Sequence, residues 1–160
     1  MPVIPHTFSL SGLAAGAKLL YFGATGTLPA RLAAEARSLK IEHVSPEALV
    51  RQEICRGTPL GQQAGRARQH GAAVPDPVLL AIVRKWFWAR KPDAGFLLEG
   101  FPATLLHARV FDEWLEAREE TLTGCFCAGP RSPAVNPEIL GHYHTLGLLH
   151  ETATAALAPA

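Results

Sequence analysis

With 160 residues, 48% hydrophobic and 18% charged, the chain has the size and composition of one globular domain and is too apolar to be disordered. A formal net charge of +1 argues against a broad basic surface for nucleic acid or anionic lipid. No uncharged apolar run is long enough to span a membrane, and three cysteines make no disulfide framework, so we expect a cytoplasmic protein.

The first part of the chain alternates strand and helix signals. Residues 1–16 are rich in small residues and are expected to form a loose leader. The apolar run Ala17–Phe22 predicts a buried parallel strand. The glycine loop Gly23–Thr27 separates it from a helix expected over Pro29–Leu39, and a second short strand is expected over Ile41–Val44.

Three pairs of a Ser, Thr or Asp followed by Pro predict three consecutive helix starts. A short polar side chain caps the first free N–H groups of a helix, and proline suits its first turn. These pairs open helices expected over Ser45–Cys55, from Thr58 to a stop at Gly71, and from Asp76 to about Arg90.

The remainder continues the alternation. A third strand is expected over Gly95–Leu98, a helix over Leu105–Arg118 and a fourth strand over Leu122–Cys127. Residues 128–137 are rich in proline and predict a loop, and Glu138–Ala158 predicts one final helix. Strands that alternate with helices predict α/β architecture with a parallel sheet of about four strands.

Four short blocks lie on this framework. Gly95–Pro102 reads GFLLEGFP, Gly57–Gly61 reads GTPLG, Gly71–Asp76 reads GAAVPD, and Leu19–Gly26 joins an apolar strand to a glycine loop. In this order and spacing, the blocks resemble those of adenylate kinases, a family of nucleoside monophosphate kinases. The resemblance extends from about Lys18 onward for about a hundred residues.

The resemblance implies a P-loop NTPase-like fold with a helical arm that binds the nucleoside monophosphate. It also implies a division of the chain. The expected parts are a leader (1–16), a core (17–127) that includes the arm (45–75), and a loop with a C-terminal helix (128–160).

The family carries an arginine-bearing lid after the fourth strand. After Arg118 this chain has one Lys or Arg, Arg131, and too few residues for that lid together with a fifth strand. Ile139–Leu149 is weakly similar to the helix that follows the lid. We therefore expect a degenerate and truncated member of the family, without a lid.

The phosphate-binding loop departs from the family pattern. Gly23 and Gly26 are retained, but either Leu28 or Pro29 occupies the position of the lysine that the resemblance implies. Thr25 or Thr27 could replace the magnesium-side threonine in part. The alternative is a plain strand-to-helix turn, because a broken motif carries little weight on its own.

The monophosphate side is better retained. Arg51 matches the arginine that the resemblance implies for the phosphate, and a guanidinium suits that geometry. Pro46 and Glu47 replace the Thr and Gly of the family, and Ala103 replaces a second arginine. His107 stands where a glutamine reads the base. Alternatively, Arg51 is a solvated arginine on a helix surface.

Glu99 stands where the resemblance implies an aspartate that organises magnesium, and its stem is one methylene longer. Gly100, the next residue, is expected in the nucleotide site. Since magnesium demands strict geometry, the longer stem is not a neutral change. No cofactor is firmly expected, and magnesium and ATP belong only to an active enzyme. Glu99 could instead cap backbone N–H groups at a strand end.

Two other features of the sequence have residue types suited to a function. Cys125 and Cys127 with His142 and His144 have zinc-ligand residue types, but two residues apart on a helix the histidines diverge, so we expect no metal site. Trp88 points away from the apolar row of its helix and is a candidate for protein contact or self-association.

Three functions remain open. The chain is an active nucleoside monophosphate kinase, a non-catalytic module that binds AMP or another small nucleotide, or a partner-binding scaffold without nucleotide. The lost lysine, arginine and lid would remove most stabilisation of a transferring phosphoryl group. The sequence therefore favours a pseudoenzyme with impaired or absent phosphotransfer.

Overall fold

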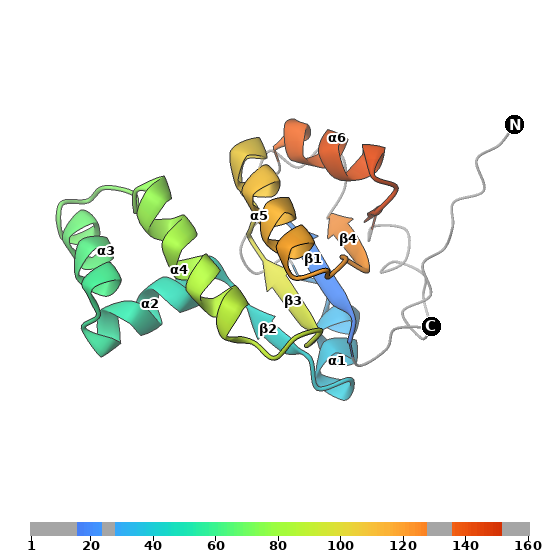
Figure 1. Ribbon diagram of the computed structural model, residues 1–160, viewed down its shortest axis with the longest axis horizontal. Helices are drawn as coiled ribbons and strands as arrows, with labels where there is room; N and C mark the ends of the chain where they lie inside the picture. Colours follow the sequence, from blue (N-terminus) through green and yellow to red (C-terminus); the bar gives the residue numbers. More distant parts are fainter. Residues whose placement is uncertain (1–15, 24–27, 128–135, 152–160) are drawn as a thin grey trace, which may run out of the picture.

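The computed structural model describes residues 16–23, 28–127 and 136–151, so nearly all of the expected leader lies outside the described residues. One parallel sheet has the strand order β2-β3-β1-β4-β5 and is flanked by helices (Figure 1). The strands are β1 (Lys18–Phe22), β2 (Glu42–Val44), β3 (Phe96–Glu99), β4 (Gly124–Cys127) and β5 (Leu149–Glu151). The helices are α1 (Ala30–Ser38), α2 (Pro46–Arg56), α3 (Pro59–Gln69), α4 (Asp76–Ala89), α5 (Leu105–Ala117) and α6 (Pro137–Thr145). The expected α/β fold is confirmed.

The sheet separates two hydrophobic clusters, because successive strand side chains point to opposite faces. The larger cluster joins alternate strand residues to α4, α5 and α6, and the smaller joins the other strand residues to α1. The larger includes Leu20, Phe22, Phe96, Leu98, Cys125 and Cys127, and the smaller includes Leu19, Tyr21, Leu97 and Phe126. None of the helices within the described ranges is long and apolar enough to cross a membrane.

The C-terminal part differs from the expectation in two ways. The sheet has five strands, not about four, and the helix expected over Glu138–Ala158 was wrong. Helix α6 ends at Thr145, and Gly147 adopts a left-handed backbone (φ 73°) that turns the chain into β5. A glycine in this conformation is a common helix stop, and within a helix it would cost about 1 kcal/mol. We predicted that no lid follows the fourth strand. Residues 128–135, which follow β4, lie outside the described residues.

Two of the three expected helix starts have the expected cap. The Ser45 hydroxyl accepts a hydrogen bond from the Ala48 N–H at 3.2 Å, and the Thr58 hydroxyl accepts one from the Gly61 N–H at 3.0 Å. The third expectation was wrong in detail, because Pro75 is the cap residue of α4 and makes no side-chain cap. The side chain of Asp76, which was expected to cap this helix, lies instead 3.2 Å from Nε2 of His107 on α5.

Helices α2 and α3 and the adjoining part of α4 project from the sheet as an arm (Figure 1). Glu53, buried at its centre, accepts hydrogen bonds from the Thr58 hydroxyl and from Lys85 Nζ at 3.0 and 3.1 Å. Burial alone would raise the pKa of Glu53, but these hydrogen bonds and the charge of Lys85 outweigh it, so the pKa is lowered. The carboxylate therefore ties all three helices together.

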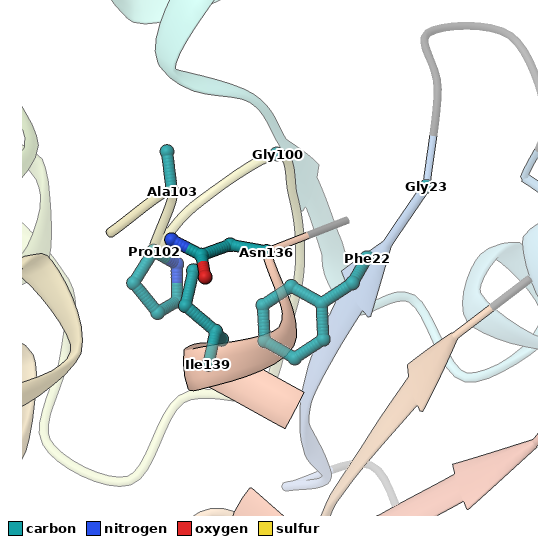
Figure 2. A pocket seen from close by; sticks show the side chains of 7 residues that line it. All are labelled: Phe22, Gly23, Gly100, Pro102, Ala103, Asn136 and Ile139. Atoms are coloured by element: carbon teal, nitrogen blue, oxygen red, sulfur yellow. The ribbon is translucent and has the colours of Figure 1, made fainter. Parts of the chain in front are cut away.

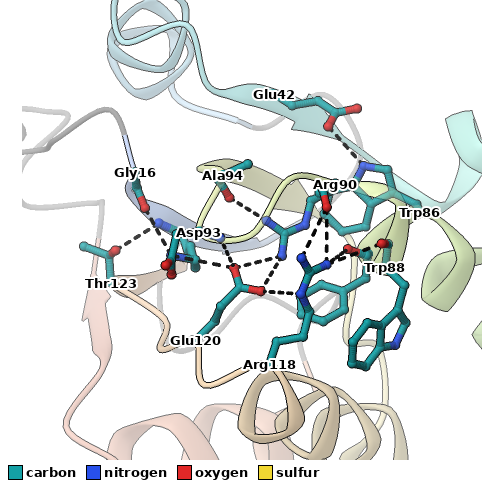
Figure 3. Close-up of polar contacts among 12 residues, drawn as sticks. Gly16, Glu42, Trp86, Trp88, Arg90, Asp93, Ala94, Arg118, Glu120 and Thr123 are labelled. Carbon is teal, nitrogen blue, oxygen red and sulfur yellow. Dashed lines mark hydrogen bonds and ion pairs between the residues drawn. The ribbon is translucent and has the colours of Figure 1, made fainter.

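A cluster of buried charges lies at the amino ends of the strands (Figure 3). Glu120 accepts two hydrogen bonds from Arg90, both at 3.1 Å, and lies 3.1 Å from Arg118 Nε. Lys18 Nζ lies 3.9 Å from the same carboxylate. Lys18 is the first residue of β1, Arg90 directly follows α4, and Arg118 directly follows α5. The cluster therefore joins these three elements at the amino ends of the strands.

Candidate nucleotide site

A small cavity opens at the carboxyl ends of β1 and β3, the edge where open α/β sheets bind ligands (Figure 2). Its volume is about 130 Å³. Segments far apart in the sequence form it: the end of β1, the loop after β3, and the first turn of α6. The lining residues are Phe22, Gly23, Gly100, Pro102, Ala103, Asn136 and Ile139.

None of these described lining residues carries a charge. The ring of Phe22 and the side chains of Pro102 and Ile139 make the wall apolar, and Ala103 contributes a methyl group (Figure 2). Asn136 provides the polar side chain, and its Oδ1 already accepts a hydrogen bond from the Glu138 N–H at 2.9 Å. The cavity therefore offers an amide N–H and backbone groups to a ligand.

The glycines of the site lie where the sequence predicts them, as far as the structure describes them. Gly23 and Gly100 both line the cavity, whereas Gly26 and Thr27 lie outside the described residues. Gly100 has a left-handed backbone (φ 86°), and its N–H donates to the Tyr21 carbonyl at 3.3 Å. This bond holds the loop after β3 beside the end of β1.

Glu99 is turned away from the cavity. Its Oε2 lies 2.9 Å from Nε2 of His43 on the neighbouring strand β2, and its side chain is 17% exposed. Glu99 alternates with Leu98 along β3 and therefore lies on the face of the sheet that α1 covers. The carboxylate at the expected magnesium position is thus already engaged by a histidine.

Arg51 lies on α2 and does not line the cavity. Its side chain is 68% exposed, and its nearest ionic contact is Glu47 Oε1, 3.9 Å from Nη2. The structure therefore places the expected phosphate-binding arginine on the arm, separate from the glycines at the strand ends.

His107 is buried below the loop after β3, and its ring stacks on Phe101 with centroids 5.4 Å apart. The Ala103 N–H donates to Nδ1 at 3.4 Å, so the neutral ring carries its proton on Nε2. Nε2 lies 3.2 Å from Asp76 Oδ1, but without the alignment of a hydrogen bond. Through this contact with Asp76, the His107 ring joins α5 to the start of α4.

Four lining residues were not assigned to the site by the sequence interpretation: Phe22, Pro102, Asn136 and Ile139. Asn136 was placed in a loop, yet Asn136-Pro137 is the same cap-and-proline signal that identifies two other helix starts. A helix was expected from Glu138, and this signal would have placed its start at Pro137, where α6 begins. Its position against the cavity depends on tertiary packing and carries no local signal.

The cysteines and histidines weighed for zinc have other surroundings. Cys125 and Cys127 are buried in the larger hydrophobic cluster, and burial raises the pKa of the Cys125 thiol. His142 Nε2 lies 2.6 Å from Asp112 Oδ2 and joins α6 to α5. Within the described ranges, no three His, Cys, Asp or Glu side chains are grouped to hold a metal ion.

Trp88 lies on the last turn of α4 with 40% of its surface exposed. The guanidinium carbons of Arg84 and Arg118 lie 5.8 and 5.2 Å from its ring centroid. The exposed indole thus lies between two cations.

Comparison with curated proteins identifies adenylate kinases as relatives. The chain is 42% identical to the adenylate kinase of Moorella thermoacetica over 84 residues, which are 52% of this chain and 39% of the relative. It is 38% identical to that of Clostridium botulinum strain Loch Maree over 87 residues, 54% and 40% of the two chains. It is 34% identical to that of Prochlorococcus marinus strain MIT 9313 over 109 residues, 66% and 57% of the two chains.

These matches are partial, because the chain spans between 39% and 57% of the length of these three relatives. No family model matches the chain.

Proposed function

Because this chain is a partial member of the adenylate kinase family, we propose that it binds a nucleoside monophosphate and has little or no phosphotransfer activity. The observation that carries the proposal is the uncharged wall of the cavity, where Ala103 presents a methyl group in place of the arginine that the resemblance implies. The arm, in contrast, keeps an accessible guanidinium at Arg51.

Catalysis of phosphoryl transfer depends on cations held in place around the developing charge. The described lining of the cavity supplies none, and the sequence has no Lys or Arg between Phe22 and Arg31, the stretch that contains the glycine loop. Backbone N–H groups of the glycine loop, which contains Gly23, Gly26 and Thr27, can still attract an anion. They support binding better than they support turnover.

Magnesium and ATP would be required only by an active enzyme. Glu99 is the carboxylate at the relevant strand end, and its contact with His43 at 2.9 Å competes with a metal ion for the same oxygen. The described residues thus do not fit a magnesium site as they stand.

On this proposal, residues 17–127 form the nucleotide-binding core, and residues 45–75 form the arm that contacts the monophosphate. Arg51 is the phosphate-binding residue, since its ionic contact with Glu47, at 3.9 Å, is weak and the side chain is 68% exposed. His107 contacts a base only if its ring leaves the contact with Asp76, which is 3.2 Å away. We therefore assign His107 a secondary role.

A calorimetric titration of AMP into the purified protein tests the binding. Saturable binding that Arg51→Ala abolishes, and that Arg66→Ala on the neighbouring helix leaves unchanged, would support it. Binding unaffected by Arg51→Ala would overturn the assignment. Formation of ADP from ATP, AMP and magnesium, well above buffer controls, would favour the alternative of an active kinase.

A second candidate function is a scaffold that contacts a protein partner or another copy of itself. It is favoured by the 40% exposure of Trp88, since exposed tryptophan is frequent at interfaces. On this alternative, sedimentation shows an oligomer that Trp88→Ala dissociates, and AMP produces no heat of binding.

A further inference from the structure

Two arginines from different helices of the arm converge on one carboxylate. Glu47 lies in the first turn of α2, Arg51 lies one turn further along it, and Arg68 lies near the end of α3. Arg51 Nη2 is 3.9 Å and Arg68 Nη2 is 4.0 Å from the same Oε1 atom of Glu47. Packing of α2 against α3 thus forms a paired guanidinium site with a carboxylate between its members.

The contacts that hold this carboxylate are loose. A charge-assisted hydrogen bond between guanidinium and carboxylate is typically about 2.7–2.9 Å long, whereas both contacts here are near 4 Å. The side chains of Glu47, Arg51 and Arg68 are 65%, 68% and 40% exposed, so water screens all three charges. Glu47 is therefore held weakly enough to be displaced.

Arg51 and the competing Glu47 lie on α2, the helix whose start adjoins the cavity. A Cβ added to Gly100 would be 3.9 Å from Cδ of Pro46, which starts α2 and immediately precedes Glu47. Gly100 itself lines the cavity. A ligand with one end at this edge of the sheet would have the first two turns of α2 within its immediate surroundings.

From this geometry we infer that Arg68 is a second phosphate-contacting residue, and that Glu47 is a built-in competitor that occupies the guanidinium pair when no ligand is bound. The ligand class is a phosphate monoester dianion. The inference deepens the proposed function and rests on it for the identity of the nucleotide. The contacts of Arg51 and Arg68 with Glu47 involve residues of the arm only, so they do not depend on which nucleotide binds.

The charges explain why a phosphate would displace the carboxylate. A phosphate monoester carries up to two negative charges and three acceptor oxygens, so two guanidinium groups can bind it at once. The Glu47 carboxylate carries one charge, and both arginines approach the same oxygen atom. Each exposed ion pair is worth at most about 1 kcal/mol, so removal of Glu47 should tighten phosphate binding by about threefold to tenfold.

The experiment compares matched charge changes in the whole chain. Glu47→Gln removes the competitor, with Glu113→Gln on α5 as its control. Arg68→Gln removes the second arginine, and Arg66→Gln on the same helix is its control, since both arginines are exposed. Each variant is titrated with AMP by calorimetry and, separately, with inorganic phosphate followed by the arginine side-chain NMR signals. Thermal unfolding verifies that each variant is folded.

We expect Glu47→Gln to tighten the binding of both probes and Arg68→Gln to weaken it, while both controls behave as the wild type. If Arg51→Gln abolishes AMP binding but Glu47→Gln and Arg68→Gln match their controls, the inference is wrong and the proposed function stands. If only inorganic phosphate binds, more tightly to Glu47→Gln and less to Arg68→Gln, the paired site stands and the nucleotide function fails. If neither probe binds any variant at millimolar concentration, both are overturned.

Discussion

Gly61 on α3 lies directly against the backbone carbonyl of Glu53 on α2. A Cβ added to Gly61 would be 2.0 Å from Glu53 O and 2.3 Å from the carbonyl carbon, far closer than nonbonded atoms approach. The close approach of α2 and α3 therefore depends on the absence of a side chain at this position. This approach also positions the Thr58 hydroxyl to donate to the Glu53 carboxylate.

We expect Gly61→Ala to destabilise the arm, because α2 and α3 must separate to admit the methyl group. Overpacking of this kind costs about 1–3 kcal/mol. Gly65→Ala, one turn further on α3, is the matched control. Its Cβ would lie 4.0 Å from the side chain of Ile54, an ordinary contact, so the higher helix propensity of alanine should make it neutral or stabilising. Urea denaturation measures both variants, and equal effects would contradict the close approach.

The lowered pKa of Glu53 predicts how stability depends on pH. A carboxyl group whose pKa is lower in the folded state stabilises the fold above its unfolded pKa, near the ordinary value of 4.5. This contribution is lost as the pH falls through the folded pKa. The difference in the free energy of unfolding between wild type and Glu53→Gln should therefore be largest near neutral pH and shrink in acid.

Denaturation at a series of pH values measures this difference. Glu113→Gln, an exposed change on α5, is the control and should show no such trend. A difference that is constant or that grows toward acid would mean that the Glu53 pKa is not lowered in the folded protein.

The buried charge cluster predicts a large effect at Glu120. Its side chain is 1% exposed and faces Arg90 and Arg118, which are 3% and 9% exposed. Removal of the charge leaves two buried guanidinium groups without their carboxylate, and breaking such a pair costs about 3–5 kcal/mol. Glu120→Gln should therefore unfold at a much lower temperature than wild type. Glu119→Gln, at the exposed neighbouring residue, should change the melting temperature little.

The elements predicted best from the sequence are those that depend on local chemistry. The pairs Ser45-Pro46 and Thr58-Pro59 correctly predicted the starts of α2 and α3, because the cap is made within one turn. Strand β5 was missed, because three residues are too few to show a periodic pattern. Its extended conformation is stabilised by pairing with β4, which is distant in the sequence. Gly147, which ends α6, was the available signal for the break.

The residues of the candidate site were assigned from the resemblance to adenylate kinases. Two of them, Gly23 and Gly100, line one cavity at the ends of β1 and β3. Asn136 and Ile139 reach the cavity through packing of α6, which no local pattern encodes. The contact between Glu99 and His43 joins two neighbouring strands, and sequence alone does not give their register.

The uncharged cavity predicts the effect of restoring a cation. Ala103→Arg places a guanidinium at the cavity wall, where the described lining residues are uncharged. A hydrogen bond between a charged group and a phosphate contributes about 1.5–3 kcal/mol, so inorganic phosphate should bind at least about tenfold more tightly. Ala103→Gln, which is long and polar but uncharged, should give little of this gain. Formation of ADP should nevertheless stay at background, because the glycine loop still lacks a lysine. Turnover by Ala103→Arg alone would contradict the proposal that the loop cannot support phosphotransfer, and phosphate affinity unchanged in that variant would mean that the cavity does not bind the anion.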